Sequence, residues 1–278
     1  MFSVVSANVN GIRAAARRDN LEWLKSSGAD VLCLQEVRAP DDIVVKILAD
    51  CGLGHWDLVH AEAATAGRSG VAILSRSRVQ EPRFGVGLKE FADSGRWVEA
   101  TVDTEHGLVT VVSTYVHTGE AGTGRQEEKY RFLDAMTKRL RQLRTASKKI
   151  GGHVIVCGDL NIAHTSRDIK NWRGNRGKAG FLEHEQAYLS RWFAKDWVDL
   201  GRAHAGDVDG PYTWWSWRGQ AFDNDSGWRI DYLMATPELA SALVSVDVGR
   251  ASSYAQRWSD HAPVIATFET PAQVPDSR

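Results

Sequence analysis

Short runs of apolar, β-favouring residues recur along the chain, and this recurrence limits the possible folds more than any other feature. Several runs are continuous rather than alternating, which is typical of strands that are buried on both faces. We expect strands at Phe2–Ala7, Val31–Leu34, Gly70–Leu74, Trp97–Val102, Leu108–Thr114, Val154–Cys157, Ile230–Met234, Val244–Val248 and Val264–Phe268. Sheets of such strands need other elements to cover both faces.

Helical patterns lie between some of these strands. The clearest helix is Gln126–Thr145, in which Tyr130, Leu133, Met136, Leu140 and Leu143 recur every three or four residues. Two shorter helices are predicted at Asn20–Ser27 and Gln186–Ala194. Strand–turn–strand stretches also occur, so the pattern favours an α/β protein with mixed sheets covered by helices.

Composition indicates a single domain. The 278 residues are 43% hydrophobic, and we assign residues 1–269 to one domain and residues 270–278 to a polar tail that we expect to be disordered. No apolar run approaches the roughly 20 residues of a membrane span, and from Met1–Asn10 we expect no secretory signal. Cys33, Cys51 and Cys157 are unclustered, which excludes a disulfide framework or a cysteine zinc site. We therefore expect a protein of the cytoplasm, associated with the nucleoid if the host is a bacterium, that binds no membrane. We also expect it to be a monomer.

The net charge of −1 means that any attraction to nucleic acid must come from a local basic surface. Three segments are predicted to be long functional loops, namely Ala61–Ser69, Gly119–Gly124 and Ala163–Gly180. The last is too long for an ordinary connection, which makes it a candidate for binding.

Polar groups cluster where five apolar runs end. These groups are Asn8 and Asn10, Glu36, Asp159 and Asn161, Asp231, and Asp260 with His261. Each segment alone has an ordinary explanation as a turn, a cap or a solvated strand end. Together they predict one site with four carboxylates and an imidazole, because strand ends meet at the sites of open α/β folds. Such a concentration of negative charge requires a hard cation, so the oxygen donors indicate Mg²⁺, with Mn²⁺ as a substitute.

These residue types suit in-line hydrolysis of a phosphodiester. A carboxylate can deprotonate water, and a metal ion with a histidine can neutralise the phosphate. No serine or cysteine nucleophile arrangement competes with this interpretation.

Five motifs give the chain a specific resemblance. ANVNGIR (7–13), LQE (34–36), GDLN (158–161), GWRIDY (227–232) and SDHAPV (259–264) occur in the order found in the exonuclease III family of apurinic/apyrimidinic (AP) endonucleases. That family belongs to the endonuclease/exonuclease/phosphatase superfamily. The resemblance runs from about Met1 to Phe268. It implies a four-layer α/β sandwich of two mixed sheets packed face to face between helices.

The resemblance also implies a role for each matching position. Glu36 resembles the main metal ligand, with Asn8, Asn10 and Asp260 nearby, directly or through water. Asp159 resembles the residue that activates water, and Asn161 resembles its positioning partner; both are also candidate metal ligands. His261, oriented by Asp231, resembles the residue that contacts the scissile phosphate, and Tyr115 matches an active-site tyrosine. The sequence departs from the family after Tyr115, where it reads VHTG (116–119) in place of proline and an amide-bearing residue.

The implied substrate is double-stranded DNA that carries abasic sites or blocked 3′ ends. Trp214, Trp228 and Ile230 match the family's pocket for the extruded sugar, and the wider cluster with Trp215 and Trp217 also favours a functional surface. Candidate phosphate contacts are Arg68, Arg96, Lys170, Arg173, Arg176 and Lys178.

The leading hypothesis is a Mg²⁺-dependent DNA repair nuclease that cuts 5′ to abasic sites and trims 3′ ends. One alternative is a phosphoesterase for inositol phosphate or sphingolipid, which would share GDLN and SDH but not the pairing of NGIR with GWRID. A second alternative is a catalytically silent DNA-binding module, which would be expected to lack part of this set of polar residues.

Overall fold

Two six-stranded mixed sheets form the centre of the protein. The computed structural model describes residues 1–19 and 21–270, so the predicted tail lies almost entirely outside the described residues. The first sheet has the order β11-β12-β1-β2-β4-β3 and the second the order β5-β6-β7-β8-β10-β9. The strands of the first sheet are β1 (Phe2–Asn8), β2 (Val31–Gln35), β3 (Asp57–Ala61), β4 (Val71–Ser75), β11 (Leu243–Val248) and β12 (Val264–Phe268). Those of the second are β5 (Val79–Phe84), β6 (Trp97–Thr104), β7 (Gly107–Tyr115), β8 (His153–Asp159), β9 (Val198–Asp199) and β10 (Asp231–Ala235).

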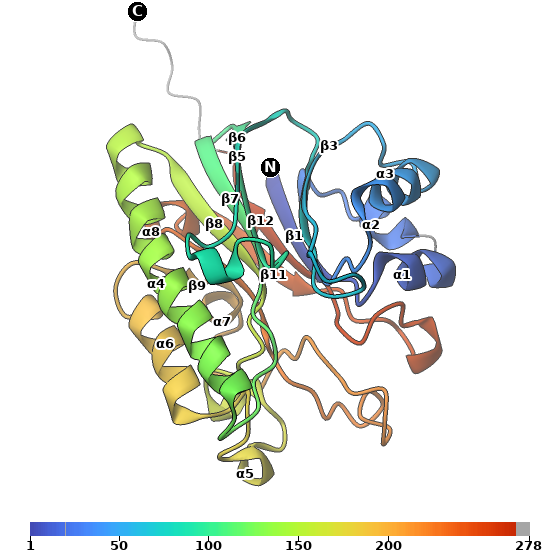
Figure 1. Cartoon of the computed structure of the whole chain (residues 1–278), viewed down its shortest axis with the longest axis vertical. Helices are drawn as coiled ribbons and strands as arrows, with labels where there is room; N and C mark the ends of the chain where they lie inside the picture. Colours follow the sequence, from blue (N-terminus) through green and yellow to red (C-terminus); the bar gives the residue numbers. More distant parts are fainter. Residues whose placement is uncertain (20, 271–278) are drawn as a thin grey trace, which may run out of the picture.

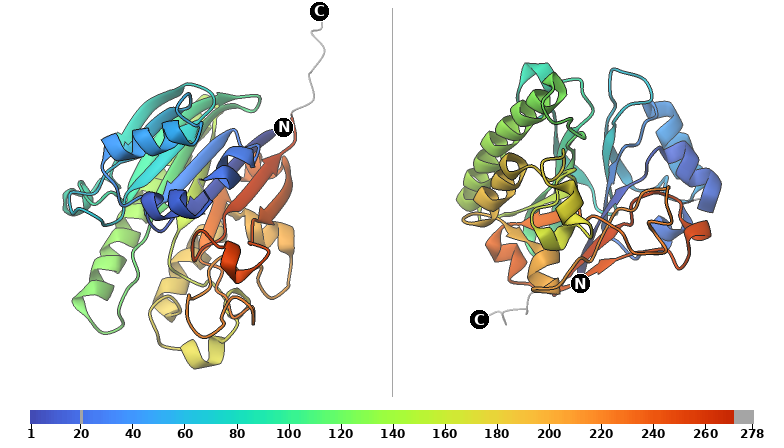
Figure 2. Two further views of the ribbon diagram at one scale, coloured as in Figure 1. Left: turned by 90° about the vertical axis from the view of Figure 1, so that its right-hand side faces the viewer. Right: turned by 90° about the horizontal axis from the view of Figure 1, so that it is seen from below.

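Helices cover the outer face of each sheet (Figure 1). The helices are α1 (Ile12–Asp19), α2 (Glu22–Ser26), α3 (Asp41–Asp50), α4 (Gly124–Ile150), α5 (Trp172–Asn175), α6 (Glu183–Phe193), α7 (Leu200–Ala205) and α8 (Pro237–Ala240). Short 3₁₀ turns occur at Lys89–Phe91, Ser166–Asp168 and Tyr254–Gln256. Seen from below, α1–α3 and the pair α4 and α6 lie on opposite sides of the strands (Figure 2). The predicted four-layer α/β sandwich is therefore confirmed.

Burial on both faces explains the continuous apolar runs. In β2, Val31 and Cys33 pack between the two sheets, whereas Leu32 and Leu34 pack under the helices of the outer layer. Each inward and outward position is thus apolar, and burial of this surface from both sides stabilises the four layers.

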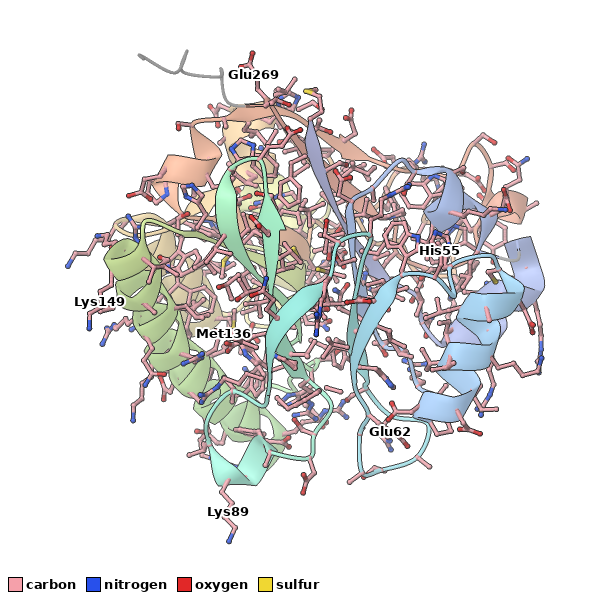
Figure 3. The ribbon with its side chains drawn as sticks, turned by 90° about the horizontal axis from the view of Figure 1, so that it is seen from above. His55, Glu62, Lys89, Met136, Lys149 and Glu269 are labelled. Carbon is pink, nitrogen blue, oxygen red and sulfur yellow. The ribbon has the colours of Figure 1, made fainter. Side chains whose placement is uncertain are left out.

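The long helix α4 is longer than the predicted Gln126–Thr145. It begins after the N-cap Thr123 and ends at Gly151, whose positive φ of 66° makes it a left-handed cap. Leu133, Met136, Leu140 and Leu143 are buried as expected. Figure 3 shows Met136 on the side of α4 that faces the sheet and Lys149 pointing outward near its end.

Among the described residues, no helix combines the length and apolar composition that crossing a bilayer requires. The three cysteines, Cys33, Cys51 and Cys157, are all buried.

Candidate active site and metal centre

The five polar segments of the sequence meet at one edge of the two sheets. β1, β2 and β8 end at this edge, with Asn8 and Asp159 as the last residues of β1 and β8. Asp231 is the first residue of β10, and the Asp260–His261 segment precedes β12, as the sequence predicted. They reach the same edge because β10 is antiparallel to β8 and β12 is antiparallel to β1.

A cleft of about 900 Å³ opens at this edge. Eleven of the predicted site residues line it: Glu36, Arg68, Arg96, Tyr115, Asp159, Asn161, Trp214, Trp228, Ile230, Asp260 and His261. Residues from both sheets contribute, so the fold itself brings together groups that are far apart in the sequence.

Three groups at the base of the cleft lie close together, and the two carboxylates among them can hold a metal ion. One ligand atom each of Glu36, Asp159 and His261 lies within 4.8 Å of the others, and all three residues are buried. The Asn8 amide Nδ2 donates hydrogen bonds of 2.9 Å to both Glu36 Oε1 and Asp159 Oδ2. Two buried carboxylates held side by side form the hard oxygen donor set that Mg²⁺ or Mn²⁺ prefers. The residues present therefore fit a divalent cation.

The backbone is strained where it presents this set. Glu36 and Asn161 both have φ near +50°, a conformation that residues other than glycine rarely adopt. Next to Asp159, Gly158 allows the close approach of β7, because a Cβ there would collide with the Thr114 carbonyl oxygen. The glycine of the GDLN motif is thus required by packing.

Asp159 is held by Asn161. The Asn161 backbone amide donates to Asp159 Oδ1 at 2.8 Å, and the side-chain Nδ2 donates to Oδ2 at 3.1 Å. Burial, together with the negative charges of Asp231 and Glu36, raises the pKa of Asp159 well above its usual range, although His261 opposes this shift. The site therefore favours a proton or a cation at this carboxylate.

His261 and Asp231 form a buried imidazole–carboxylate pair. His261 Nδ1 lies 2.9 Å from Asp231 Oδ2, and Thr213 Oγ1 donates to that carboxylate at 2.6 Å. Burial favours the neutral ring, but the charges of Asp231 and Asp159 outweigh it and raise the pKa of His261 to about 10. The other ring nitrogen, Nε2, lies 3.8 Å from Asp159 Oδ2. A protonated His261 thus presents a positive N–H group at the base of the cleft.

Tyr115 lies beside Asp159, since the two residues pair in register across β7 and β8. Burial and the nearby Glu36 and Asp159 raise the pKa of its phenol above its ordinary value, so the hydroxyl keeps its proton. At the sequence departure after Tyr115, the Thr118 hydroxyl donates to Asn161 Oδ1 at 3.1 Å. Thr118 therefore orients Asn161 in this structure.

Asp260 and Asn10 lie next to the three-residue cluster. Asn10 Nδ2 donates to Asp260 Oδ1 at 2.7 Å, and the Trp214 indole donates to Oδ2 at 3.1 Å. Asn8 uses its side-chain oxygen to accept from the Asn10 backbone amide. These contacts place Asn8, Asn10 and Asp260 where they orient the cluster, and their predicted role as ligands stays a prediction.

The predicted sugar pocket forms one wall of the cleft. Trp214 and Trp228 meet edge to face with ring centres 6.2 Å apart. The backbone of Trp214 also pairs with that of His261 in an isolated antiparallel β-bridge. Trp215 and Trp217, which the sequence grouped with them, do not line the cleft. Trp215 is a core residue with 1% of its surface exposed, and Trp217 packs beneath the Arg18 and Arg257 guanidinium groups.

The predicted phosphate contacts divide into two groups. Arg68 and Arg96 line the cleft, where Arg96 pairs with Glu128 at 2.9 Å. Lys170, Arg173, Arg176 and Lys178 lie outside the cleft lining, on and around α5. Arg173 and Arg176 both stack on Trp172, with guanidinium carbons 4.4 and 4.7 Å from the ring centre. Their role in binding stays a prediction.

Sequence reasoning missed three charged residues at the site. Arg38 lines the cleft and forms an ion pair with Glu36. Lys129 and Glu185 form a buried ion pair behind Asn161. Lys129 carried a usable signal, because it falls on the apolar stripe of α4, four residues before Leu133.

Hydrogen bonds also join the two sheets directly beneath the site. Gln35, which precedes Glu36, donates from Nε2 to Ser113 Oγ at 3.1 Å, and Ser113 Oγ donates to the Leu34 carbonyl at 2.9 Å. Gln35 and Ser113 are completely buried. These bonds fix the position of β2 relative to β7 at the level of Glu36 and Tyr115.

Comparisons with known proteins match a span of the chain that contains every predicted site residue. The profile of the Endonuclease/Exonuclease/phosphatase family matches residues 5–261. An exodeoxyribonuclease of Bacillus subtilis is 34% identical over 95% of this chain and 98% of its own length. A DNA-(apurinic or apyrimidinic site) endonuclease of Dictyostelium discoideum is 29% identical over 95% of this chain and 69% of its own. The solved structure of a 3′-5′ exonuclease from Neisseria meningitidis is similar with a TM-score of 0.82 and 27% identity, covering 96% of this chain and all of that one.

Proposed function

The chain belongs to the Endonuclease/Exonuclease/phosphatase family, and we propose that it is a Mg²⁺-dependent DNA repair nuclease of the exonuclease III type. It hydrolyses the phosphodiester on the 5′ side of abasic sites in double-stranded DNA and trims 3′ ends. The observation that carries the proposal is the buried group Glu36, Asp159 and His261 beside the aromatic wall of the cleft. The relatives named above are nucleases, which favours DNA over an inositol phosphate or a sphingolipid.

Glu36 and Asp159 would hold the cation, with Asn8 keeping their oxygens together. When bound, the ion supplies Lewis acidity and neutralises charge on the phosphate. Asp159, held by Asn161, would accept the proton of the attacking water while the water oxygen bonds to phosphorus and the bond from phosphorus to the 3′ oxygen of the preceding nucleotide breaks. That 3′ oxygen leaves and takes up a proton from solvent. Protonated His261, kept in orientation by Asp231, donates a hydrogen bond to a phosphate oxygen and stabilises the negative charge that develops there. The Tyr115 phenol keeps its proton and can donate to the same phosphate.

Substrate recognition follows from the wall of Trp214, Trp228 and Ile230. A sugar without a base would enter between these side chains, which line the cleft, whereas a complete nucleotide would be too large. Arg68 and the basic residues around α5 would contact phosphates on either side, which compensates for the net charge of −1. We further propose that the enzyme acts as a monomer in the cytoplasm, or at the nucleoid if the host is a bacterium.

The test is a gel assay on a duplex with one synthetic abasic site, with Mg²⁺, with Mn²⁺ and with a chelator. We expect a single cut 5′ to the abasic site that depends on the metal ion, and slower release of nucleotides from 3′ ends. An undamaged duplex of the same sequence is the matched substrate control. Failure to cut the abasic duplex in the presence of Mg²⁺ would contradict the proposal.

A further inference from the structure

A buried ion pair lies between the two outer helices of the second sheet. Lys129 on α4 and Glu185 on α6 are each completely buried, with Lys129 Nζ 2.6 Å from Glu185 Oε1. Burying two charges is expensive, and apolar residues of similar size often stabilise a protein as well or better. The two charges also form hydrogen bonds with the backbone of the Gly180–Leu182 loop and of Asn161.

Glu185 holds the loop that closes the aromatic wall. Its Oε2 accepts hydrogen bonds from the backbone amides of Gly180 at 2.7 Å and Leu182 at 3.1 Å. Gly180 lines the cleft, and a Cβ on it would lie 3.0 Å from the Trp228 ring. The position of the Gly180 backbone, set by Glu185, therefore determines how closely the loop packs against Trp228.

Lys129 holds the backbone of Asn161. Its Nζ donates to the Asn161 carbonyl oxygen at 2.8 Å, and Asn161 is the residue with φ of 50° whose side chain contacts Asp159. The same Lys129 nitrogen contacts Glu185, so one short chain of charge-assisted bonds runs from the loop beside Trp228 to Asn161.

We propose that Lys129 and Glu185 are a positioning pair that couples the sugar pocket to Asn161 and through it to Asp159. This proposal rests on the proposed function. In it, the ion pair makes recognition of an abasic sugar and alignment of the hydrolytic groups depend on each other. A pair that only stabilised the fold would not need to contact both the pocket loop and the backbone of Asn161.

The first test is Glu185→Gln. The carboxylate accepts from four donors, because Gln126 Nε2 also donates to Oε1 at 3.1 Å. A glutamine turns its NH₂ group toward the donors on one side, so either the loop amides or Lys129 lose their acceptor. The matched control is Glu99→Gln, which cuts the pair of Glu99 with Arg139 on the same helix α4. Glu99 is 3% exposed and does not line the cleft.

Two quantities separate positioning from stability. One is the single-turnover rate on saturating abasic duplex with Mg²⁺; the other is the ratio of Kd values for intact and abasic duplex in chelator. We expect Glu185→Gln to lower each by about tenfold in protein that circular dichroism shows to be folded, since small misplacements of reacting groups cost rate steeply. Glu99→Gln is expected to lower the melting temperature while leaving both quantities within about twofold of the wild type.

The positioning role would be overturned if Glu185→Gln and Glu99→Gln had the same single-turnover rate and the same ratio of Kd values. If Glu185→Gln does not fold, the double variant Lys129→Met with Glu185→Gln removes both charges, and it must show the same two losses. Wild-type protein that binds abasic and intact duplex equally would contradict the proposed function instead, so the two failures are distinguishable.

Discussion

Acid is expected to destabilise this protein measurably through one carboxylate, Asp168. This residue is completely buried in the loop between β8 and α6 and accepts a hydrogen bond of 2.6 Å from Arg229 Nε. Arg202 pairs with the same oxygen, and Thr165 donates to the other one. Burial alone would raise the pKa of Asp168, but the two arginines outweigh it and lower the pKa from its ordinary value of 3.8 to about 2.

The magnitude follows from linkage between protonation and folding. Because the pKa is lower in the folded chain, the ionised carboxylate stabilises the fold above the unfolded pKa and loses this contribution as the pH falls toward 2. A difference of this size corresponds to about 2.5 kcal/mol near neutral pH. About 1 kcal/mol of it is expected to be lost between pH 6 and pH 3.

The measurement compares urea unfolding of the wild type and Asp168→Asn at pH 6 and pH 3. The asparagine does not titrate, so the stability difference between the two proteins should shrink by about 1 kcal/mol at the lower pH. Other acidic groups titrate in both proteins and cancel in the comparison. A difference that stays constant or grows on acidification would refute the reasoning.

Four further outcomes are expected. Asp159→Asn should lower kcat by at least about 10³-fold and change the Kd for abasic duplex by less than about tenfold, because it removes the proton acceptor but no contact with the DNA backbone. An equal loss of binding would contradict this role. Glu36→Gln should raise the Mg²⁺ concentration that gives half-maximal activity by about tenfold, and an unchanged metal titration would remove Glu36 from the site. Duplex affinity should fall steeply with salt, by about 10³-fold between 50 and 200 mM if about six phosphates are contacted, whereas a flat salt dependence argues against a basic binding face. Phe132→Ala should lower the free energy of unfolding by about 3–5 kcal/mol in urea melts, because this fully buried ring packs between α4 and the second sheet; a loss below about 1 kcal/mol would show that the cavity collapses.

The sequence predicted the sheets well where strands are buried on both faces. It missed β3, β5 and β9. β9 has only two residues, and β5 is a largely exposed edge strand that contains Pro82, so it carries no apolar pattern. The Arg-rich helix α1 was missed for a similar reason, since its few buried residues are separated by charged ones. Amphipathic signals report burial, and elements with little buried surface give little signal.

The site residues were found because their segments carry polar groups beside apolar strands. Their partners were harder to find. Glu36 forms an ion pair with Arg38, and Lys129 forms one with Glu185. Lys129 and Glu185 are 56 positions apart, so no local sequence pattern links them. Only the folded chain shows that Asp231 opposes Asp159, because antiparallel pairing decides which end of a strand reaches the cleft.

The hydrogen bonds of Ser113 with Gln35 and Leu34 have a consequence for engineering this protein. Glu36 directly follows β2 of one sheet and Asp159 ends β8 of the other, so the contacts between the two sheets set the distance between these carboxylates. Substituting Ser113 would leave Glu36, Asp159 and His261 unchanged, yet it would remove hydrogen bonds that hold β2 against β7 beneath them. The spacing of the two carboxylates is thus open to change through a buried residue of the interior that does not line the cleft.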